Sequence, residues 1–252
     1  MMSSHTGYHR AQVVERVDWT DELFSLRVSH TPLDFVAGQF TKLGLETADG
    51  ELISRAYSLV NAPDTQNGHE FLITTVPQGK LSPSLQALVA GDSIWVGDSA
   101  HGDLTRASVP EQTQDLWLLA TGTGIGPFLS LLQGRQLAPR RIILVHGVRF
   151  ARDLAYQALI HKLLNEYQGQ LSYHPVVSRE PVENTLQGRI PALIDSAALQ
   201  DAAGVRMSPQ HSFAMLCGNP DMIKDTIKSL QNQGLERYRQ ATGGNIIHER
   251  YW

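Results

Sequence analysis

The segment Ser54–Val60 places an arginine and a phenol in the same short strand. Because side chains alternate between the two faces of a strand, Arg55 and Tyr57 share a face with Ile53 and Leu59. A guanidinium binds phosphate through charge-assisted hydrogen bonds, and a phenol ring stacks on flat, unsaturated rings. The pair indicates a flat, negatively charged ligand, although an exposed strand with an isolated arginine and tyrosine would show the same pattern.

A second combination suited to phosphate is Gly79–Pro83, where a glycine, a lysine and the start of a helix stand close together. Ser82 is a candidate N-cap, and Pro83 is the candidate first residue of that helix. Backbone N–H groups at a helix start attract phosphate, and Lys80 adds a positive charge. We therefore expect Arg55 to meet a diphosphate while the tyrosine of its strand lies beside a planar ring.

A glycine-rich turn, TGTGIGP at residues 121–127, lies between an expected strand and the expected helix Phe128–Gln133. Such a turn lets backbone N–H groups close on a pyrophosphate at the helix N-terminus. No lysine follows, which excludes a Walker-type loop, and the spacing is GxGxG instead of GxGxxG. A tight strand-to-helix connection without any ligand is the alternative interpretation.

Three arginines follow expected strands in the second half of the chain, namely Arg149, Arg179 and Arg189. At the end of the second strand of a dinucleotide site, an acidic residue favours NAD and an arginine favours the 2′-phosphate of NADP. Each arginine alone would be typical of a solvated surface charge. Together they predict a phosphate clamp.

A further strand, turn and helix is expected around Leu216–Asp221, with Asn219 as the N-cap and Pro220 as the first helical residue. Cys217 has the character of a small buried residue, and His146 that of a structural histidine. We find no cluster with metal-ligand spacing and no Ser-His-Asp set.

Around these motifs, the expected elements change character near residue 110. Short strands are expected at 11–17, 23–28, 39–45, 55–60, 70–76 and 93–96, with one helix at 82–88. After the polar segment 110–115, buried strands are expected at 116–120, 141–146, 171–177 and 212–217, alternating with helices. The pattern predicts an antiparallel β-barrel over residues 1–110, followed over residues 111–252 by an α/β domain with an open parallel sheet.

Composition restricts the class of protein. With 252 residues, 42% hydrophobic and 18% charged, the chain is globular. A single cysteine excludes an intrachain disulfide and any four-cysteine metal site. We expect no membrane span, no nucleic-acid partner and a cytoplasmic location. Residues 1–110 carry 7 Lys+Arg against 13 Asp+Glu, and the rest 14 against 12, which favours anion binding in the second half.

Taken together, the motifs resemble those of bacterial ferredoxin/flavodoxin–NADP+ reductases, especially the enterobacterial type that ends in tryptophan. The resemblance rests on segments 55–58, 79–83, 121–127 and 216–220 and on the terminal Tyr251-Trp252, and it spans nearly the whole chain. It implies an FAD-binding barrel followed by an NADP(H)-binding domain.

The resemblance also implies roles for individual residues. Arg55 pairs with the FAD diphosphate, Tyr57 stacks on the isoalloxazine, and Ser58 forms a hydrogen bond near its N5. The residues implied for FAD are Arg55, Ala56, Tyr57, Ser58, Lys80, Leu81, Ser82, Thr123 and Trp252, and those for NADP are Gly122, Gly124, Arg149, Arg179, Arg189 and Asn219. Ser58 and Cys217 are the implied catalytic residues, and no metal is expected.

Two segments depart from the family pattern. Alanine also occurs in the family at the position of Gly124, and we expect this difference to have little consequence. Residues 238–249 differ from the basic stretch expected there, so no role is transferred to them.

The implied activity is hydride transfer between NADPH and FAD, followed by single-electron transfer to ferredoxin or flavodoxin. An NAD(P)H-dependent flavin or quinone reductase is the alternative, and a non-catalytic flavin sensor or a module of a larger complex belongs to another class. The sequence leaves open the acceptor, the direction of electron flow and the oligomeric state.

Single replacement of Arg149, Arg179 or Arg189 by glutamine should weaken the use of NADPH by about ten- to a hundredfold, because a charge-assisted contact contributes roughly 1.5–3 kcal/mol. Use of NADH should hardly change. Steady-state kinetics with both coenzymes test this, and equal losses with both would assign the arginines to folding or general binding.

Overall fold

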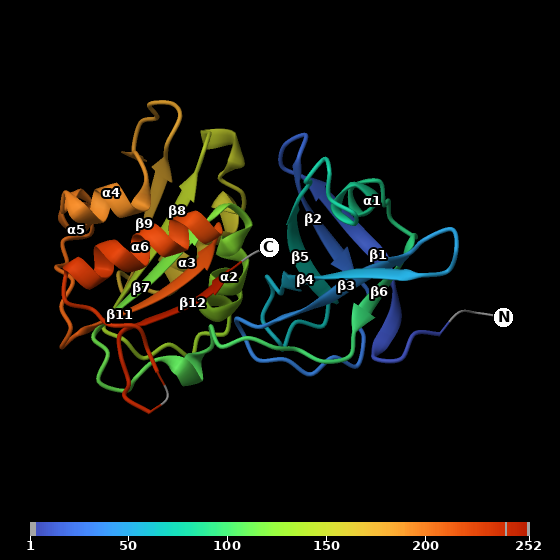
Figure 1. The fold of residues 1–252 in the computed structure, drawn as a ribbon, viewed down its shortest axis with the longest axis horizontal. Helices are drawn as coiled ribbons and strands as arrows, with labels where there is room; N and C mark the ends of the chain where they lie inside the picture. Colours follow the sequence, from blue (N-terminus) through green and yellow to red (C-terminus); the bar gives the residue numbers. More distant parts are fainter. Residues whose placement is uncertain (1–3, 240, 251–252) are drawn as a thin grey trace.

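The computed structural model describes residues 4–239 and 241–250, so Tyr251 and Trp252 lie outside the described residues. Two domains lie side by side, one built on antiparallel strands and the other on parallel strands (Figure 1). The two sheet types agree with the predicted fold class.

The first domain is a six-stranded antiparallel barrel. Its elements are β1 (Tyr8–Asp18), β2 (Leu23–Val28), β3 (Phe40–Glu46), β4 (Leu52–Ser58), β5 (His69–Thr74), α1 (Ser82–Gln86), β6 (Ser93–Gly97) and the 3₁₀ turn η1 (Arg106–Ser108). The strand order is β4-β3-β6-β1-β2-β5. An antiparallel bridge between Leu59 and Phe71 brings the edge strands together and closes the barrel.

Alternation of side chains fills the barrel. One residue in two along β2 and β5, such as Phe24, Leu26, Phe71 and Ile73, is buried in a single apolar cluster. Tyr57 packs against the rim of the same cluster, so the phenol of β4 rests on the barrel core.

The second domain is a six-stranded parallel sheet. Its elements are β7 (Asp115–Thr121), the 3₁₀ turn η2 (Gly122–Ile125), α2 (Gly126–Gln133), β8 (Arg141–Val148), the 3₁₀ turn η3 (Ala151–Asp153), α3 (Gln157–Glu166), β9 (Leu171–Val177), β10 (Leu186–Gln187), α4 (Ile190–Asp195), α5 (Ala198–Ala203), β11 (Ser212–Gly218), α6 (Pro220–Asn232) and β12 (Ile246–Arg250). The strand order is β10-β9-β8-β7-β11-β12. The chain builds outward from β7 to β10 and then returns to the other side of β7 as β11, so the topology switches between β7 and β11.

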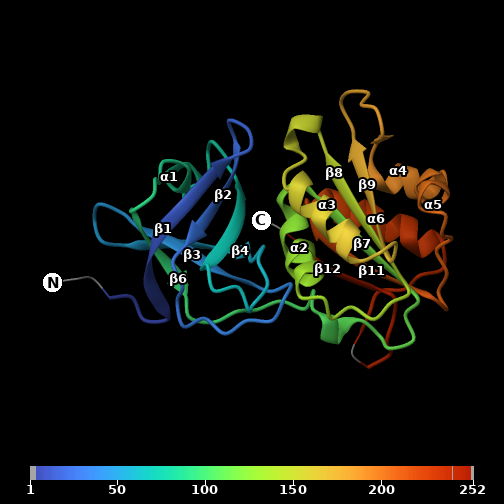
Figure 2. The same cartoon turned by 180° about the vertical axis from the view of Figure 1, so that it is seen from behind.

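Both faces of this sheet are covered by helices (Figures 1 and 2). Along β7, Leu116 and Leu118 face α2 and α3, while Trp117 and Leu119 face α4, α5 and α6. Burial on both faces explains why the parallel strands are continuous apolar runs.

Helix α2 joins the domains through a shared core. Barrel residues Leu23, Val60 and Leu72 belong to the same apolar cluster as the residues of α2 and β7. The hydroxyl of Ser130 accepts a hydrogen bond from Gly38 N (3.2 Å) and donates one to the carbonyl of Asn61 (2.7 Å). The domain contact is therefore apolar burial fixed by buried hydrogen bonds.

The predicted elements agree well with the observed ones where the apolar pattern is strong. The bounds of β2 and β9 are as predicted, whereas β10 and β12 were not predicted. β10 has only two residues, and β12 ends in the polar sequence His248-Glu249-Arg250, which lacks the apolar run of a buried strand. The domain boundary at residues 110 and 111 stays a prediction.

No helix in the described part of the chain has the length and apolar character needed to cross a membrane.

Ser130→Ala should lower the free energy of unfolding by about 1–3 kcal/mol, because it leaves a buried N–H and a buried carbonyl without their partner. Denaturant unfolding measures the change, with exposed Ser84→Ala in α1 as the matched control. An equal, small effect of both substitutions would contradict the role of Ser130 in joining the domains.

Candidate functional site

The site lies where the topology of the parallel sheet switches. In open α/β sheets, ligands bind outside the carboxyl ends of the strands at such a point. Here β7 runs into the turn η2, and the neighbouring β11 ends at Cys217-Gly218. Thr121 at the end of β7 ties the two together, because its Oγ1 accepts a hydrogen bond from Asn219 N (3.1 Å).

The glycine turn is wound more tightly than predicted. Residues 122–125 form a 3₁₀ turn that continues directly into α2, which begins at Gly126 and not at Phe128. Gly122 has a φ of +54°, which favours glycine, and a side chain there would meet open space.

Gly124 requires glycine for a different reason. A Cβ on Gly124 would lie on the carbonyl oxygen of Cys217, 2.6 Å from the carbonyl carbon and 2.9 Å from Gly218 Cα. The expectation that alanine here has little consequence is therefore wrong for this backbone, because main-chain atoms would have to move. Gly124 serves the packing of η2 against β11.

The side chain of His146 forms a hydrogen bond to the glycine turn. Its side chain is 1% exposed, and Nε2 donates a hydrogen bond to the carbonyl of Gly122 (3.0 Å). Nδ1 is buried and has no hydrogen-bond partner among the described residues. Burial lowers the pKa of His146 from 6.5 to about 4, so the ring stays neutral in the folded protein. The prediction of a structural histidine is supported by this hydrogen bond.

Ser58 approaches the same turn from the barrel. It ends β4, is 6% exposed, and its Cβ lies 3.8 Å from the position that a Cβ on Gly126 would take. The structure thus brings Ser58 and the backbone of Cys217 to the η2–α2 junction, at Gly126 and Gly124 respectively, and Thr123 within η2 is buried. Cys217 itself is fully buried.

The rest of the β4 motif is more open. Arg55 and Ala56 are exposed, and Arg55 Nη1 donates to the carbonyl of Ser54 (2.7 Å). Tyr57 is half-buried, and burial raises the pKa of its phenol to about 12 despite the opposing charge of Arg55. The phenol therefore stays neutral and suited to lie against a ring.

The loop before α1 differs from the prediction in one respect. Ser82 is not the N-cap: the helix begins at Ser82, Leu81 is the capping residue, and Pro83 is therefore the second helical residue. Ser82 Oγ instead accepts a hydrogen bond from Val76 N (2.9 Å), which ties the start of the helix to the segment after β5. Lys80, near the end of this loop, is exposed.

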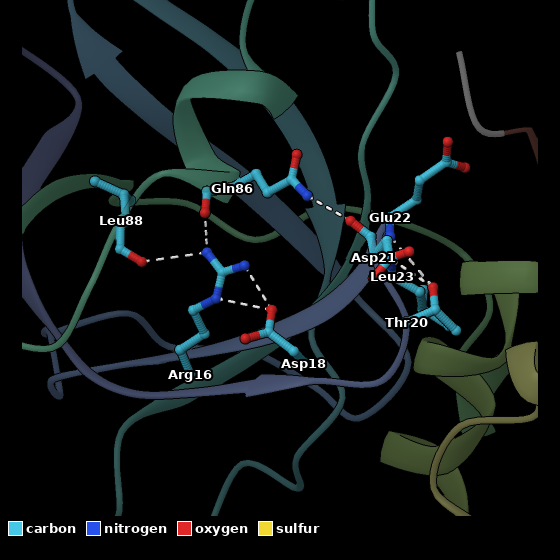
Figure 3. Close-up of polar contacts among 8 residues, drawn as sticks. All are labelled: Arg16, Asp18, Thr20, Asp21, Glu22, Leu23, Gln86 and Leu88. Carbon is cyan, nitrogen blue, oxygen red and sulfur yellow. Dashed lines mark hydrogen bonds and ion pairs between the residues drawn. The ribbon is translucent and has the colours of Figure 1, made fainter.

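The other end of α1 is held by Arg16 (Figure 3). Its guanidinium donates to the carbonyls of Gln86 and Leu88 and pairs with Asp18. Cations near the last carbonyls stabilise a helix end. Arg16, which sequence reasoning missed, therefore fixes the short helix that positions the Lys80 loop.

The three predicted arginines lie at the carboxyl edge of the sheet. Arg179 N donates to the carbonyl of Arg149 (3.0 Å), so the loops after β8 and β9 are adjacent, and Arg189 is the N-cap residue of α4. All three side chains are exposed. In the described part of the chain, none of them forms an ion pair.

Asn219 is an N-cap, as predicted. Its Oδ1 accepts hydrogen bonds from Asp221 N (2.9 Å) and Met222 N (3.1 Å), and Pro220 is the first residue of α6. Because Asn219 Oδ1 accepts hydrogen bonds from the first N–H groups of α6, a ligand would meet the side-chain N–H groups of Asn219.

Sequence reasoning also missed Glu249, which lies next to Cys217 in the pairing of β11 with β12. Its Oε1 accepts a hydrogen bond from Asp103 N in the barrel domain (2.8 Å), and Oε2 is buried without a hydrogen-bond partner among the described residues. Burial raises the pKa of this carboxyl above its usual range. No local pattern marks Glu249, because its hydrogen-bond partner Asp103 lies in the other domain.

Trp252, the remaining predicted FAD contact, lies outside the described residues. Within those residues, no group of three or more His, Cys, Asp or Glu is arranged to hold a metal ion.

Comparison with known proteins identifies the family. The family model "Oxidoreductase FAD-binding domain" matches residues 11–102, and "Oxidoreductase NAD-binding domain" matches residues 118–228. A flavodoxin/ferredoxin–NADP reductase from Escherichia coli is 50% identical over 217 residues, which cover 85% of this chain and 86% of the relative. The chain belongs to the flavodoxin/ferredoxin–NADP reductase family.

Further relatives of this reductase support the assignment. A ferredoxin–NADP reductase from Pseudomonas aeruginosa is 39% identical, over 92% of this chain and 93% of that one. A ferredoxin NADP+ reductase from Neisseria gonorrhoeae, solved with bound FAD and NADP, superposes with a TM-score of 0.90 at 29% identity, covering 98% of this chain and 99% of that one.

Replacement of His146 in the reductase should change how stability depends on pH. The folded pKa is about 4 against 6.5 in the unfolded chain, so the unfolded state binds the proton first, and stability is lost as the pH falls from 6.5 toward 4. Between about pH 7 and about pH 5, the free energy of unfolding of His146→Gln should therefore fall by about 1–2 kcal/mol less than that of the wild type.

Urea unfolding at the two pH values measures this difference, and exposed His161→Gln in α3 is the control. If His146→Gln and the wild type lose the same stability on acidification, His146 does not remain neutral in the fold.

Proposed function

We propose that this chain is an FAD-dependent reductase that moves hydride between NADPH and FAD and exchanges single electrons with ferredoxin or flavodoxin. The observation that supports it best is that Ser58 from the barrel and the backbone of Cys217 from the sheet both lie against the same glycine turn, at Gly126 and Gly124 respectively. In a member of the flavodoxin/ferredoxin–NADP reductase family, this junction is where a nicotinamide and a flavin would meet.

We propose further that residues 1–110 form the FAD-binding unit and residues 111–252 the NADP(H)-binding unit. The residues present fit FAD: Arg55 and Lys80 are exposed cations without ion pairs in the described part of the chain, and Tyr57 offers a neutral, half-buried ring. In this proposal Arg55, Lys80, Leu81 and Ser82 hold the diphosphate, and Ala56 and Tyr57 line the flavin.

The residues also fit NADP. Arg149, Arg179 and Arg189 stand at one edge of the sheet with no carboxylate partner among the described residues, as a 2′-phosphate site requires. Gly122, Gly124 and Asn219 shape the edge of the turn that would face the dinucleotide.

When bound, FAD accepts a hydride and releases electrons one at a time. The protein supplies position: Ser58, Thr123 and Cys217 are 6%, 8% and 0% exposed, so packing fixes these residues at the turn where the rings would meet. Ser58 offers a hydroxyl hydrogen bond to the flavin. We place the protein in the cytoplasm, because its single cysteine fits a reducing compartment.

The purified protein should be yellow with FAD bound, and anaerobic NADPH should bleach the visible flavin absorbance. Adding oxidised ferredoxin or flavodoxin should then restore the absorbance, whereas free flavin or a quinone should do so slowly. Rapid-mixing absorbance spectroscopy measures each step. Equal rates with free flavin would favour the flavin reductase alternative, and a folded protein that takes up no FAD would refute the proposal.

A further inference from the structure

Two guanidinium groups pack against one aromatic ring beside the predicted 2′-phosphate site. The guanidinium carbon of Arg152 lies 5.2 Å from the centroid of the Phe150 ring, and that of Arg179 lies 5.8 Å from the same centroid. Both distances fall within the range of cation–π attraction. Arg179 is one of the three predicted arginines, whereas Phe150 and Arg152 were not singled out by any motif.

The backbone around this ring is fixed by hydrogen bonds. Asp153 Oδ2 accepts from Phe150 N (3.3 Å), and Glu180 Oε1, from the loop after β9, accepts from Ala151 N (2.7 Å). Arg179 N donates to the carbonyl of Arg149 (3.0 Å). The turn η3 and the loop after β9 therefore form one unit, which holds Phe150 and Arg152 beside the predicted site.

The charges of this unit are unbalanced. The two carboxylates named above accept hydrogen bonds from backbone N–H groups, and no ion pair in the described part of the chain involves Arg149, Arg152, Arg179 or Arg189. By contrast, exposed Arg206 pairs with Asp201. Two cations held against one ring repel each other, and a doubly charged anion between them would relieve the repulsion.

We infer that Arg152 is a fourth cation for the 2′-phosphate of NADP(H), and that Phe150 is the positioning residue that holds Arg152 and Arg179 toward it. The inference rests on the proposed function, because Arg149, Arg179 and Arg189 define the phosphate site. Its ligand is the adenosine 2′-phosphate part of the coenzyme, so Arg152 contributes to the choice of NADP over NAD.

The test is isothermal titration of the FAD-loaded enzyme with 2′-phospho-AMP and, separately, with 5′-AMP. Arg152→Gln should raise the Kd for 2′-phospho-AMP about three- to tenfold and leave the Kd for 5′-AMP unchanged. Phe150→Leu should act in the same direction, whereas Phe150→Tyr, which keeps the ring, should retain wild-type affinity. In the double variant R152Q/F150L, the Kd for 2′-phospho-AMP should rise by less than the two single fold-increases multiplied together, because the two residues act together.

Arg206→Gln is the control for a general loss of positive charge and should change neither Kd. Arg179→Gln separates the two proposals. If it weakens 2′-phospho-AMP binding while Arg152→Gln does not, only the role of Arg152 is refuted. If neither substitution has an effect, the 2′-phosphate binds elsewhere and both are refuted. Equal losses for both nucleotides with Arg152→Gln would also overturn the specific role.

Discussion

The burial of α2 between the barrel and the parallel sheet is the constraint on which the rest of the structure depends. Residues 126–132 are buried, because one side of the helix packs on β7 and another meets barrel residues such as Val60 and Leu72. A helix with two buried sides can be placed in few ways. Ser130 Oγ accepts a buried hydrogen bond from Gly38 N and donates one to the carbonyl of Asn61, and these bonds fix the rotation and height of the helix, since leaving the groups unpaired would cost free energy. The position of the barrel relative to the sheet follows from that placement.

The glycine turn inherits its position from α2. It winds from the end of β7 directly into the helix, so it cannot move away from β11, and Gly124 must lie against the backbone of Cys217. His146 fixes the other side of the turn by its hydrogen bond to Gly122. The barrel reaches the same place through Ser58, which is packed near Gly126. The junction of the proposed enzyme is thus a product of backbone packing, with glycine at position 124, where two segments of the chain approach too closely for a side chain.

Charge is distributed around this rigid centre. Carboxylates such as Asp153, Glu180 and Asp18 support backbone or arginine groups, while Arg55, Lys80 and the arginines at the sheet edge keep their charges exposed. Anionic ligands would therefore meet cations whose positions are set by neighbouring loops, which reduces the entropy lost on binding. The short helix α1 illustrates the principle, because Arg16 on β1 holds its far end while its near end shapes the Lys80 loop.

The sequence by itself determined the two sheet types, most strand positions and the cap at Asn219, because alternation, apolar runs and capping are local properties. It also placed Arg149 and Arg179 at strand ends, since a strand end can be read from its neighbours. The tertiary structure decided what depends on distant contacts. Ser82 bonds to Val76 instead of capping its helix, Gly124 is forced by Cys217, and Glu249 accepts a hydrogen bond from Asp103 N of the barrel. Each of these outcomes is set by chain segments that are not adjacent in sequence, and the energy of a buried polar group or a close backbone contact depends on them and not on local pattern.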